Sequence, residues 1–93
     1  MNNKRTHIEV MHDILGAVKN RNGKIKPTHI LYKSNLSHQM MTSYLKELIE
    51  KDLLFEQRLE NGRTYSLASK GYQFLERYAL INDFTSSFGL NSN

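Results

Sequence analysis

The sequence predicts a mainly α-helical domain with one small β-hairpin. Three observations lead to this prediction. Apolar residues repeat at the spacing of a buried helical face in three separate stretches. An Asn-Gly pair at 61–62 lies between two segments that read as strands, which is the strongest short-range signal of a hairpin. The only other candidate strand, at residues 24–26, is too short to build the sheet of an α/β protein.

The first predicted helix spans residues 7 to about 20. Thr6 and Glu9 have the spacing of a capping box, in which side chains and backbone of the first turn bond reciprocally. Its apolar residues repeat at helical spacing, at Ile8, Met11, Ile14, Leu15 and Val18. Asn22-Gly23 is expected to end this helix, since glycine readily adopts the left-handed cap conformation.

Residues 27–51 predict two helices joined by a tight turn. The shorter helix begins at Pro27, where a missing N–H costs nothing, and ends near Lys33. Polar residues at 34–35 favour the turn. Ser37 is a good N-cap for the longer helix. The buried face of that helix is formed by Met41, Tyr44, Leu45 and Leu48. Together these features are typical of a helix-turn-helix.

A hairpin follows the helix pair directly. Its predicted strands are residues 53–59 and residues 64–68, and Tyr65 and Leu67 of the second strand alternate with polar residues. The turn is expected at Asn61-Gly62. Because a lone hairpin is marginally stable in water, this one must pack against the helices.

The last predicted helix runs from Lys70 to about Asp83, with Ser69 as its N-cap. Its apolar stripe is expected to include Tyr72, Leu75, Tyr78 and Ala79, with Leu80, Ile81 and Phe84 as further candidates. Residues 85–93 are rich in Ser, Asn and Gly and are expected to form a flexible tail. The order of these elements suits a winged helix-turn-helix, with a three-helix core, the hairpin as the wing and a C-terminal helix, over residues 1–84.

Six short segments carry a family resemblance: Lys26-Pro27-Thr28-His29-Ile30, Asn35-Leu36-Ser37, Tyr44-Leu45-Lys46-Glu47-Leu48, Leu53-Leu54, Thr64-Tyr65-Ser66-Leu67 and Ser69-Lys70-Gly71. With them, the chain resembles the small archaeal winged helix-turn-helix proteins, which are DNA-binding proteins and transcription regulators. The resemblance implies DNA binding. In relatives with a long terminal helix it also implies subunit pairing through an antiparallel coiled coil, for which the helix expected here offers barely two heptads.

Amino-acid composition and charge further limit the classes of protein to which this chain can belong. Cysteine is absent, which excludes disulfides, thiol catalysis and thiolate metal sites. No apolar run approaches the roughly 20 residues of a membrane span, and we expect a cytoplasmic protein with no membrane partner. The net charge of +4 suits a nucleic-acid partner. However, residues 1–33 hold seven Lys or Arg against two Asp or Glu, whereas residues 34–56 hold two against four.

The residues predicted to read DNA lie on and just before the outer face of the longer helix: Ser37, His38, Gln39, Thr42, Ser43 and Lys46. Gln39 can bond adenine bidentately, Lys46 can reach guanine or a phosphate, and the hydroxyl residues can meet either. An ordinary solvated helix face would have the same composition, and the wing and the fold favour DNA. Glu47 and Glu50 would repel phosphates, so insertion is expected to use the amino-terminal half of the helix.

Two further groups are predicted to hold phosphates. Arg58 and Arg63 flank Asn61 on the hairpin, and cations on a projecting hairpin can track the backbone or enter a minor groove. The alternative is that these charges protect an exposed strand edge from aggregation. Thr28, at a helix start, offers a hydroxyl and nearby backbone N–H groups to a phosphate. Lys24, Lys26 and Lys33 belong to the same cluster, and the alternative is that these lysines are only solubilising surface charge.

The last helix has more apolar surface than one contact needs, which predicts a homodimer. The candidate interface residues are Tyr72, Phe74, Leu75, Tyr78, Ile81 and Phe84. The alternative is that Phe74 and Ile81 cover the core of their own domain, or that the tail folds over them.

No metal, cofactor or small-molecule ligand is expected. The four histidines are scattered and have no cysteine partners, unlike ligands of a metal site. There is no Gly-rich phosphate loop or nucleophile elbow, so we do not expect an enzyme. The leading hypothesis is sequence-specific binding of double-stranded DNA by a transcription regulator. The alternatives are a winged-helix protein-interaction module that never touches DNA, favoured by the acidic middle segment, and a non-specific chromatin-type DNA-binding protein.

Overall fold

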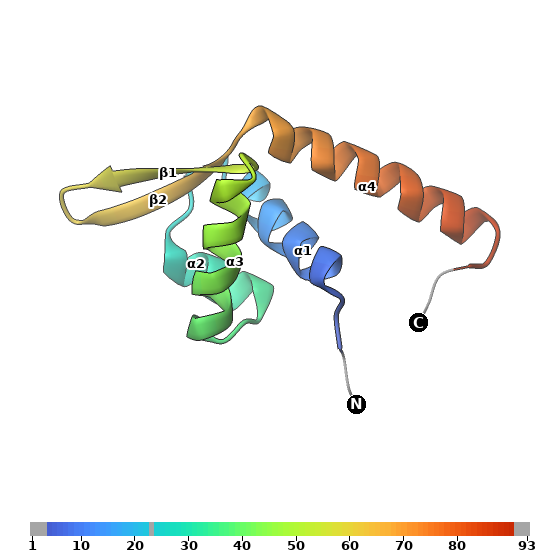
Figure 1. The fold of residues 1–93 in the computed structure, drawn as a ribbon, viewed down its shortest axis with the longest axis horizontal. Coiled ribbons are helices and arrows are strands. Elements are labelled where there is room, and N and C mark those ends of the chain that lie inside the picture. Colours follow the sequence, from blue (N-terminus) through green and yellow to red (C-terminus); the bar gives the residue numbers. More distant parts are fainter. Residues whose placement is uncertain (1–3, 23, 91–93) are drawn as a thin grey trace.

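The computed structural model describes residues 4–22 and 24–90. In that part of the chain the elements follow one another as α1 (His7–Asn20), α2 (Pro27–Ser34), α3 (His38–Glu50), β1 (Leu54–Leu59), β2 (Gly62–Leu67) and α4 (Ser69–Ser87). The first three helices form the body, the hairpin projects from one side of it, and α4 leaves on the other side (Figure 1). This confirms the predicted winged helix-turn-helix architecture.

The start of α1 is fixed by the predicted capping box. The Thr6 hydroxyl accepts a hydrogen bond from the backbone N–H of Glu9 at 3.1 Å, and the Glu9 carboxylate accepts one from the N–H of Thr6 at 2.9 Å. At the other end, Asn22 adopts the left-handed conformation with φ 58°. The predicted cap residue, Gly23, lies outside the described residues.

Helices α2 and α3 end in the same way, and these ends set the chain direction. Asn35 and Asp52 are left-handed, with φ of 53° and 62°. The next residues, Leu36 and Leu53, each donate their N–H to the carbonyl five residues earlier, at 3.2 and 2.9 Å. This is the Schellman pattern, which turns the chain sharply at a helix end. In both cases it returns a leucine to the core, since Leu36 and Leu53 are buried.

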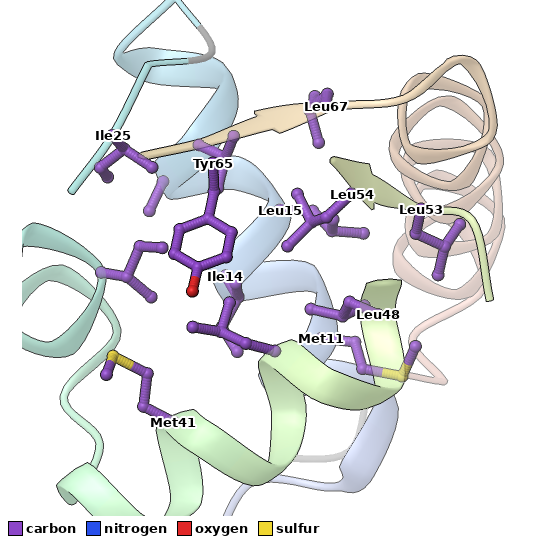
Figure 2. Close-up of a cluster of buried hydrophobic side chains, with 14 of the residues drawn as sticks. Met11, Ile14, Leu15, Ile25, Met41, Leu48, Leu53, Leu54, Tyr65 and Leu67 are labelled. Atoms are coloured by element: carbon purple, nitrogen blue, oxygen red, sulfur yellow. The ribbon is translucent and has the colours of Figure 1, made fainter. Parts of the chain in front are cut away.

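The core lies where α1, α3 and the base of the hairpin meet. Ile14, Leu48, Leu54 and Tyr65 point into it from these elements (Figure 2). Tyr65 also exchanges two backbone hydrogen bonds with Ile25, at 2.9 and 3.1 Å, so the minimal strand predicted around residue 25 is present as a single bridge. The hairpin is therefore joined to the body through side chains and backbone together.

The hairpin turn lies one residue earlier than predicted. Leu59 pairs with Gly62, so the two loop residues are Glu60 and Asn61 rather than Asn61 and Gly62. Gly62 has φ 142°, a conformation that side chains disfavour, and it is the first residue of β2. The glycine thus begins the return strand instead of forming the tip.

Both predicted ends of α4 are wrong. Ser69 is the first helical residue and the N-cap is Ala68, which has no side-chain cap bond. The helix ends at Ser87 rather than near Asp83. The hydroxyls of Thr85 and Ser87 donate to carbonyls of their own helix, at 3.0 and 2.8 Å, so these residues are compatible with helical structure. Residues 85–87, which the sequence assigned to the tail, are therefore helical.

The actual stop signal of α4 is a glycine that sequence analysis overlooked. Gly89 has φ 65°, and its N–H bonds the Ser86 carbonyl at 3.1 Å. The N–H of Leu90 bonds the Thr85 carbonyl at 2.7 Å, which completes a third Schellman end. The glycine permits the left-handed turn that halts the helix.

The core-facing side of α4 also differs from the prediction. Among its residues only Gly71 is buried. Phe74 and Leu75 pack partly against the core, whereas Tyr72 is 50% exposed and Ala79 is exposed. The helix contacts the body along its first half, as far as Tyr78, which stacks on His12 of α1, and its second half then leaves the body (Figure 1). The spacing of apolar residues along one helix does not show how far the rest of the domain extends beside that helix.

We expect opposite effects from two glycine-to-alanine substitutions. A Cβ at Gly71 would overlap the carbonyl oxygen of Leu53, whereas a Cβ at Gly16 in α1 meets nothing within 4 Å. Gly71→Ala should therefore lower the free energy of unfolding by about 1–3 kcal/mol. Gly16→Ala should raise it by about 0.5–1 kcal/mol through helix propensity. Urea denaturation measures both, and equal stabilisation by the two variants would contradict the close packing of α4 on Leu53.

Candidate nucleic-acid interface

The outer face of α3 is exposed along its length. Met41, Leu45 and Leu48 are buried against the body. The predicted reading residues on the helix all have exposed side chains: His38, Gln39, Thr42, Ser43 and Lys46. No other element of the described chain covers this face. The periodicity of the sequence therefore places the candidate residues on the solvent side.

Two of the predicted hydroxyl residues have local partners. Ser37 caps α3, as predicted, and its hydroxyl oxygen accepts the N–H of Met40 at 3.1 Å. Thr42 donates its hydroxyl to the His38 carbonyl at 3.0 Å. Met40 itself is 43% exposed, which the sequence analysis missed because the adjacent Met41 belongs to the buried stripe. The outer face therefore includes one apolar side chain among its polar ones.

A groove separates α3 from the wing. It brings together four of the predicted site residues: His38, Thr42 and Lys46 from the helix and Arg63 from β2. Glu50 and Glu56 line the same groove. It therefore contains both cations and carboxylates, and its charge is mixed rather than uniformly positive.

A second hollow lies between the start of α2 and the tip of the wing. Thr28, Asn61 and Arg63 line it, together with Lys26. Arg63 therefore borders both hollows and links the two groups of predicted phosphate contacts. Gln39, Ser43 and Arg58 are exposed but line neither of these hollows.

Ion pairing distinguishes the two arginines of the wing. Arg63 donates to the Glu56 carboxylate with an N–O distance of 3.0 Å, and this hydrogen bond raises the pKa of the Arg63 guanidinium above its usual value. Arg58 lies directly opposite Arg63 in the strand register. It has no carboxylate within ion-pair distance among the described residues. Sequence analysis missed Glu56, although strand alternation places it on the same face as Arg58.

Glu47 faces α1 rather than the groove. The His7 ring nitrogen lies 2.9 and 3.0 Å from its two carboxylate oxygens, and Lys51 lies 3.5 Å away. The hydrogen bond with His7 lowers the pKa of Glu47 below its usual value, with smaller contributions from the charges of His7 and Lys51. Glu50 instead lines the groove. Of the two acidic residues expected to repel phosphates, only Glu50 therefore borders the candidate site.

The winged helix-turn-helix family model matches residues 4–86. The chain belongs to the winged helix-turn-helix family. The match extends from the residues before α1 to the last turn of α4, and so includes the helix pair and the wing. No curated protein sequence matches this chain.

Solved structures share this fold. Sso10a-2, a DNA-binding protein from Sulfolobus solfataricus, aligns with a TM-score of 0.74 and 21% identity over 96% of this chain and 100% of that one. MepR, a transcription regulator of the Staphylococcus aureus multidrug efflux pump MepA, gives 0.75 and 15% over 85% and 60%. A MarR family transcriptional regulator from Silicibacter pomeroyi gives 0.70 and 20% over 90% and 58%. The chain thus spans about three fifths of the two latter proteins.

The predicted dimer surface of this winged-helix chain divides into two parts. Phe74 and Leu75 pack against the domain's own core, and Tyr78 stacks on His12 of α1 with ring centroids 4.0 Å apart. Ile81 and Phe84, by contrast, are 64% and 58% exposed. Tyr72 is exposed as well. Phe74 therefore packs partly on the core of its own domain, whereas Ile81 is left uncovered by the described chain.

Among the described residues, no three His, Cys, Asp or Glu side chains are grouped closely enough to hold a metal ion. Nor does any helix in this part of the chain combine the length and apolar character needed to cross a bilayer.

Proposed function

We propose that this winged helix-turn-helix protein binds double-stranded DNA sequence-specifically and acts as a transcription regulator. The observation that carries the proposal is the exposed polar face of α3 beside the projecting wing, with Lys46 and Arg63 bordering the groove between them. A helix with its side chains is about 10–12 Å wide, and the major groove of B-DNA is about 12 Å wide. The DNA-binding and regulatory roles printed for Sso10a-2 and MepR support the same proposal.

The proposed contacts divide between base reading and phosphate binding. Gln39 and Ser43 are exposed in the first half of α3, away from Glu50, and are proposed to read base edges. The proposed phosphate contacts are Lys46 on the same helix and, around it, Thr28, Arg58, Asn61 and Arg63. Phosphate contacts fix the orientation of a protein on the duplex, whereas base contacts supply the specificity.

One observation favours a second candidate function. Glu50 and Glu56 line the groove beside α3 and would repel a phosphate backbone there. A protein-interaction module would be compatible with this mixed charge. Selection of bound sequences from random duplex DNA separates the candidates: enrichment of a motif supports the proposal, binding without enrichment indicates a chromatin-type protein, and no binding favours the interaction module.

Substitutions on α3 test the assignment of the reading face. Gln39→Ala should weaken binding to the selected sequence by roughly fivefold to a hundredfold, the range of one bidentate base contact, and leave arbitrary duplex unaffected. Lys46→Ala should weaken binding and, if it removes a phosphate contact, reduce the dependence of log K on log salt by about 1. Fluorescence anisotropy at several salt concentrations measures both effects.

Lys70→Ala is the matched control for charge, because Lys70 is an exposed lysine in the first turn of α4, outside the proposed interface. It should leave the affinity and the salt dependence nearly unchanged. Unchanged specific binding in both α3 variants would show that this helix does not read the duplex, even if the protein binds DNA.

The proposal includes a homodimer formed through the far half of α4. Leu80, Ile81 and Phe84 form an exposed apolar group on the part of α4 that projects from the body, and Phe88 and Leu90 extend it just beyond the end of the helix. Burying such a group removes apolar surface from water, which favours association. A symmetric pair would present two copies of α3 to paired half-sites on DNA.

Light scattering tests this dimer directly. At micromolar concentration the wild-type protein should have twice the mass of the 10.9 kDa chain. Ile81→Gln should shift the population toward single chains because it places a polar amide in the apolar contact. Ile8→Gln, at a comparably exposed position in α1, should not. A wild-type mass of one chain at this concentration would refute the dimer.

A further inference from the structure

The wing has two arginines on one face but only one of them is neutralised. Arg58 and Arg63 are directly opposed in the register, and like charges so placed destabilise a hairpin. Glu56 lies on the same face, two residues before Arg58, and accepts a hydrogen bond from Arg63 at 3.0 Å. Among the described residues Arg58 has no corresponding carboxylate. The positive charge of Arg63 is therefore paired with a carboxylate of the described chain, whereas that of Arg58 is not.

Glu56 is held in position by its surroundings. Its cross-strand partner is Tyr65, which is 4% exposed and anchors the hairpin in the core. The side chain of Glu56 is itself only 21% exposed. The carboxylate therefore lies on the core-facing side of the wing, beside the residue that anchors the hairpin in the core. Its position does not depend on a mobile segment.

The Glu56–Arg63 pair lies where a DNA backbone would pass. Both residues line the groove between α3 and the wing, opposite Lys46. Glu56 occupies only the Nη1 side of the guanidinium, so a phosphate that enters this groove can still reach the other N–H groups of Arg63. There it meets the negative charge of Glu56, and the full positive charge of Arg63 becomes available to it only when the carboxylate is displaced. Arg58 is paired with no carboxylate among the described residues, so it can bind a phosphate without losing a partner.

We propose that Glu56 is a specificity-determining residue that withholds Arg63 from arbitrary duplex DNA. In a loose, sequence-independent complex Arg63 stays paired with Glu56, and the wing contributes Arg58 alone. When α3 fits its sequence, the backbone is held in the groove and a phosphate replaces the carboxylate on Arg63. This inference rests on the proposed DNA-binding function and adds to it a means of limiting sequence-independent affinity.

Glu56→Gln tests the inference because it keeps the shape of the side chain and removes its charge. On an arbitrary duplex, log K should fall more steeply with log salt, by about 1, because Arg63 becomes a phosphate contact. Affinity at low salt should rise roughly twofold to fivefold, the factor that an exposed ion pair commonly supplies. On the selected sequence the slope should not change, since Arg63 already contacts a phosphate there.

Two controls separate release of Arg63 from a general loss of negative charge. Glu60→Gln removes a carboxylate from the wing turn, where Glu60 has no ion-pair partner among the described residues, and should leave the salt slope unchanged. In an Arg63→Ala background, Glu56→Gln should no longer alter the slope. Urea denaturation of every variant confirms that the comparison is made between folded proteins.

Three results would overturn the inference. The effect of Glu56→Gln could equal that of Glu60→Gln, or persist without Arg63, and either result would mean that Glu56 acts only through its charge. Weaker binding in Glu56→Gln would mean that the carboxylate orients Arg63 toward DNA. Failure of the wild-type protein to bind any duplex would instead remove the proposed function itself, and is distinguishable because it appears before any variant is made.

Discussion

The attachment of the hairpin to the core determines where the wing lies relative to α3. Tyr65 is buried between the helices, and its backbone is bonded in both directions to Ile25 (Figure 2). Two residues earlier on the same strand face, Arg63 lies in the groove beside α3. Because α3 packs on the same core through Leu48, the helix and the wing have one fixed relation to each other. The candidate interface is therefore a property of the core as much as of its own residues.

Local signals made the starts of α1, α2 and α3 predictable, whereas both ends of α4 were missed. Thr6 and Ser37 act within one turn of chain, so their capping roles can be recognised from sequence. The stops depend on left-handed residues, and at Asn35 and Asp52 these are not glycines. The helix α4 shows the limit most clearly, because its exposure depends on where α1 stops supporting it. This limit is set by three-dimensional packing, which the spacing of apolar residues along α4 does not specify.

The candidate site, like the fold, was predictable only in part. The exposed face of α3 follows from helical periodicity alone, as residues 38–46 show. The pairing of Glu56 with Arg63 does not, because it depends on the register of the hairpin. A turn at Asn61-Gly62 would place Arg58 opposite Tyr65, whereas the observed turn places it opposite Arg63. A shift of one residue in the turn thus decides which charges meet.

The central claim is that α3 and the wing contact the same stretch of DNA. Amide chemical shifts recorded while the protein is titrated with its selected duplex test this claim most directly. The account predicts perturbations concentrated at residues 38–46 and 58–63, with residues 80–88 at the far end of α4 unaffected. Perturbations confined to α4, or absent from α3, would contradict it.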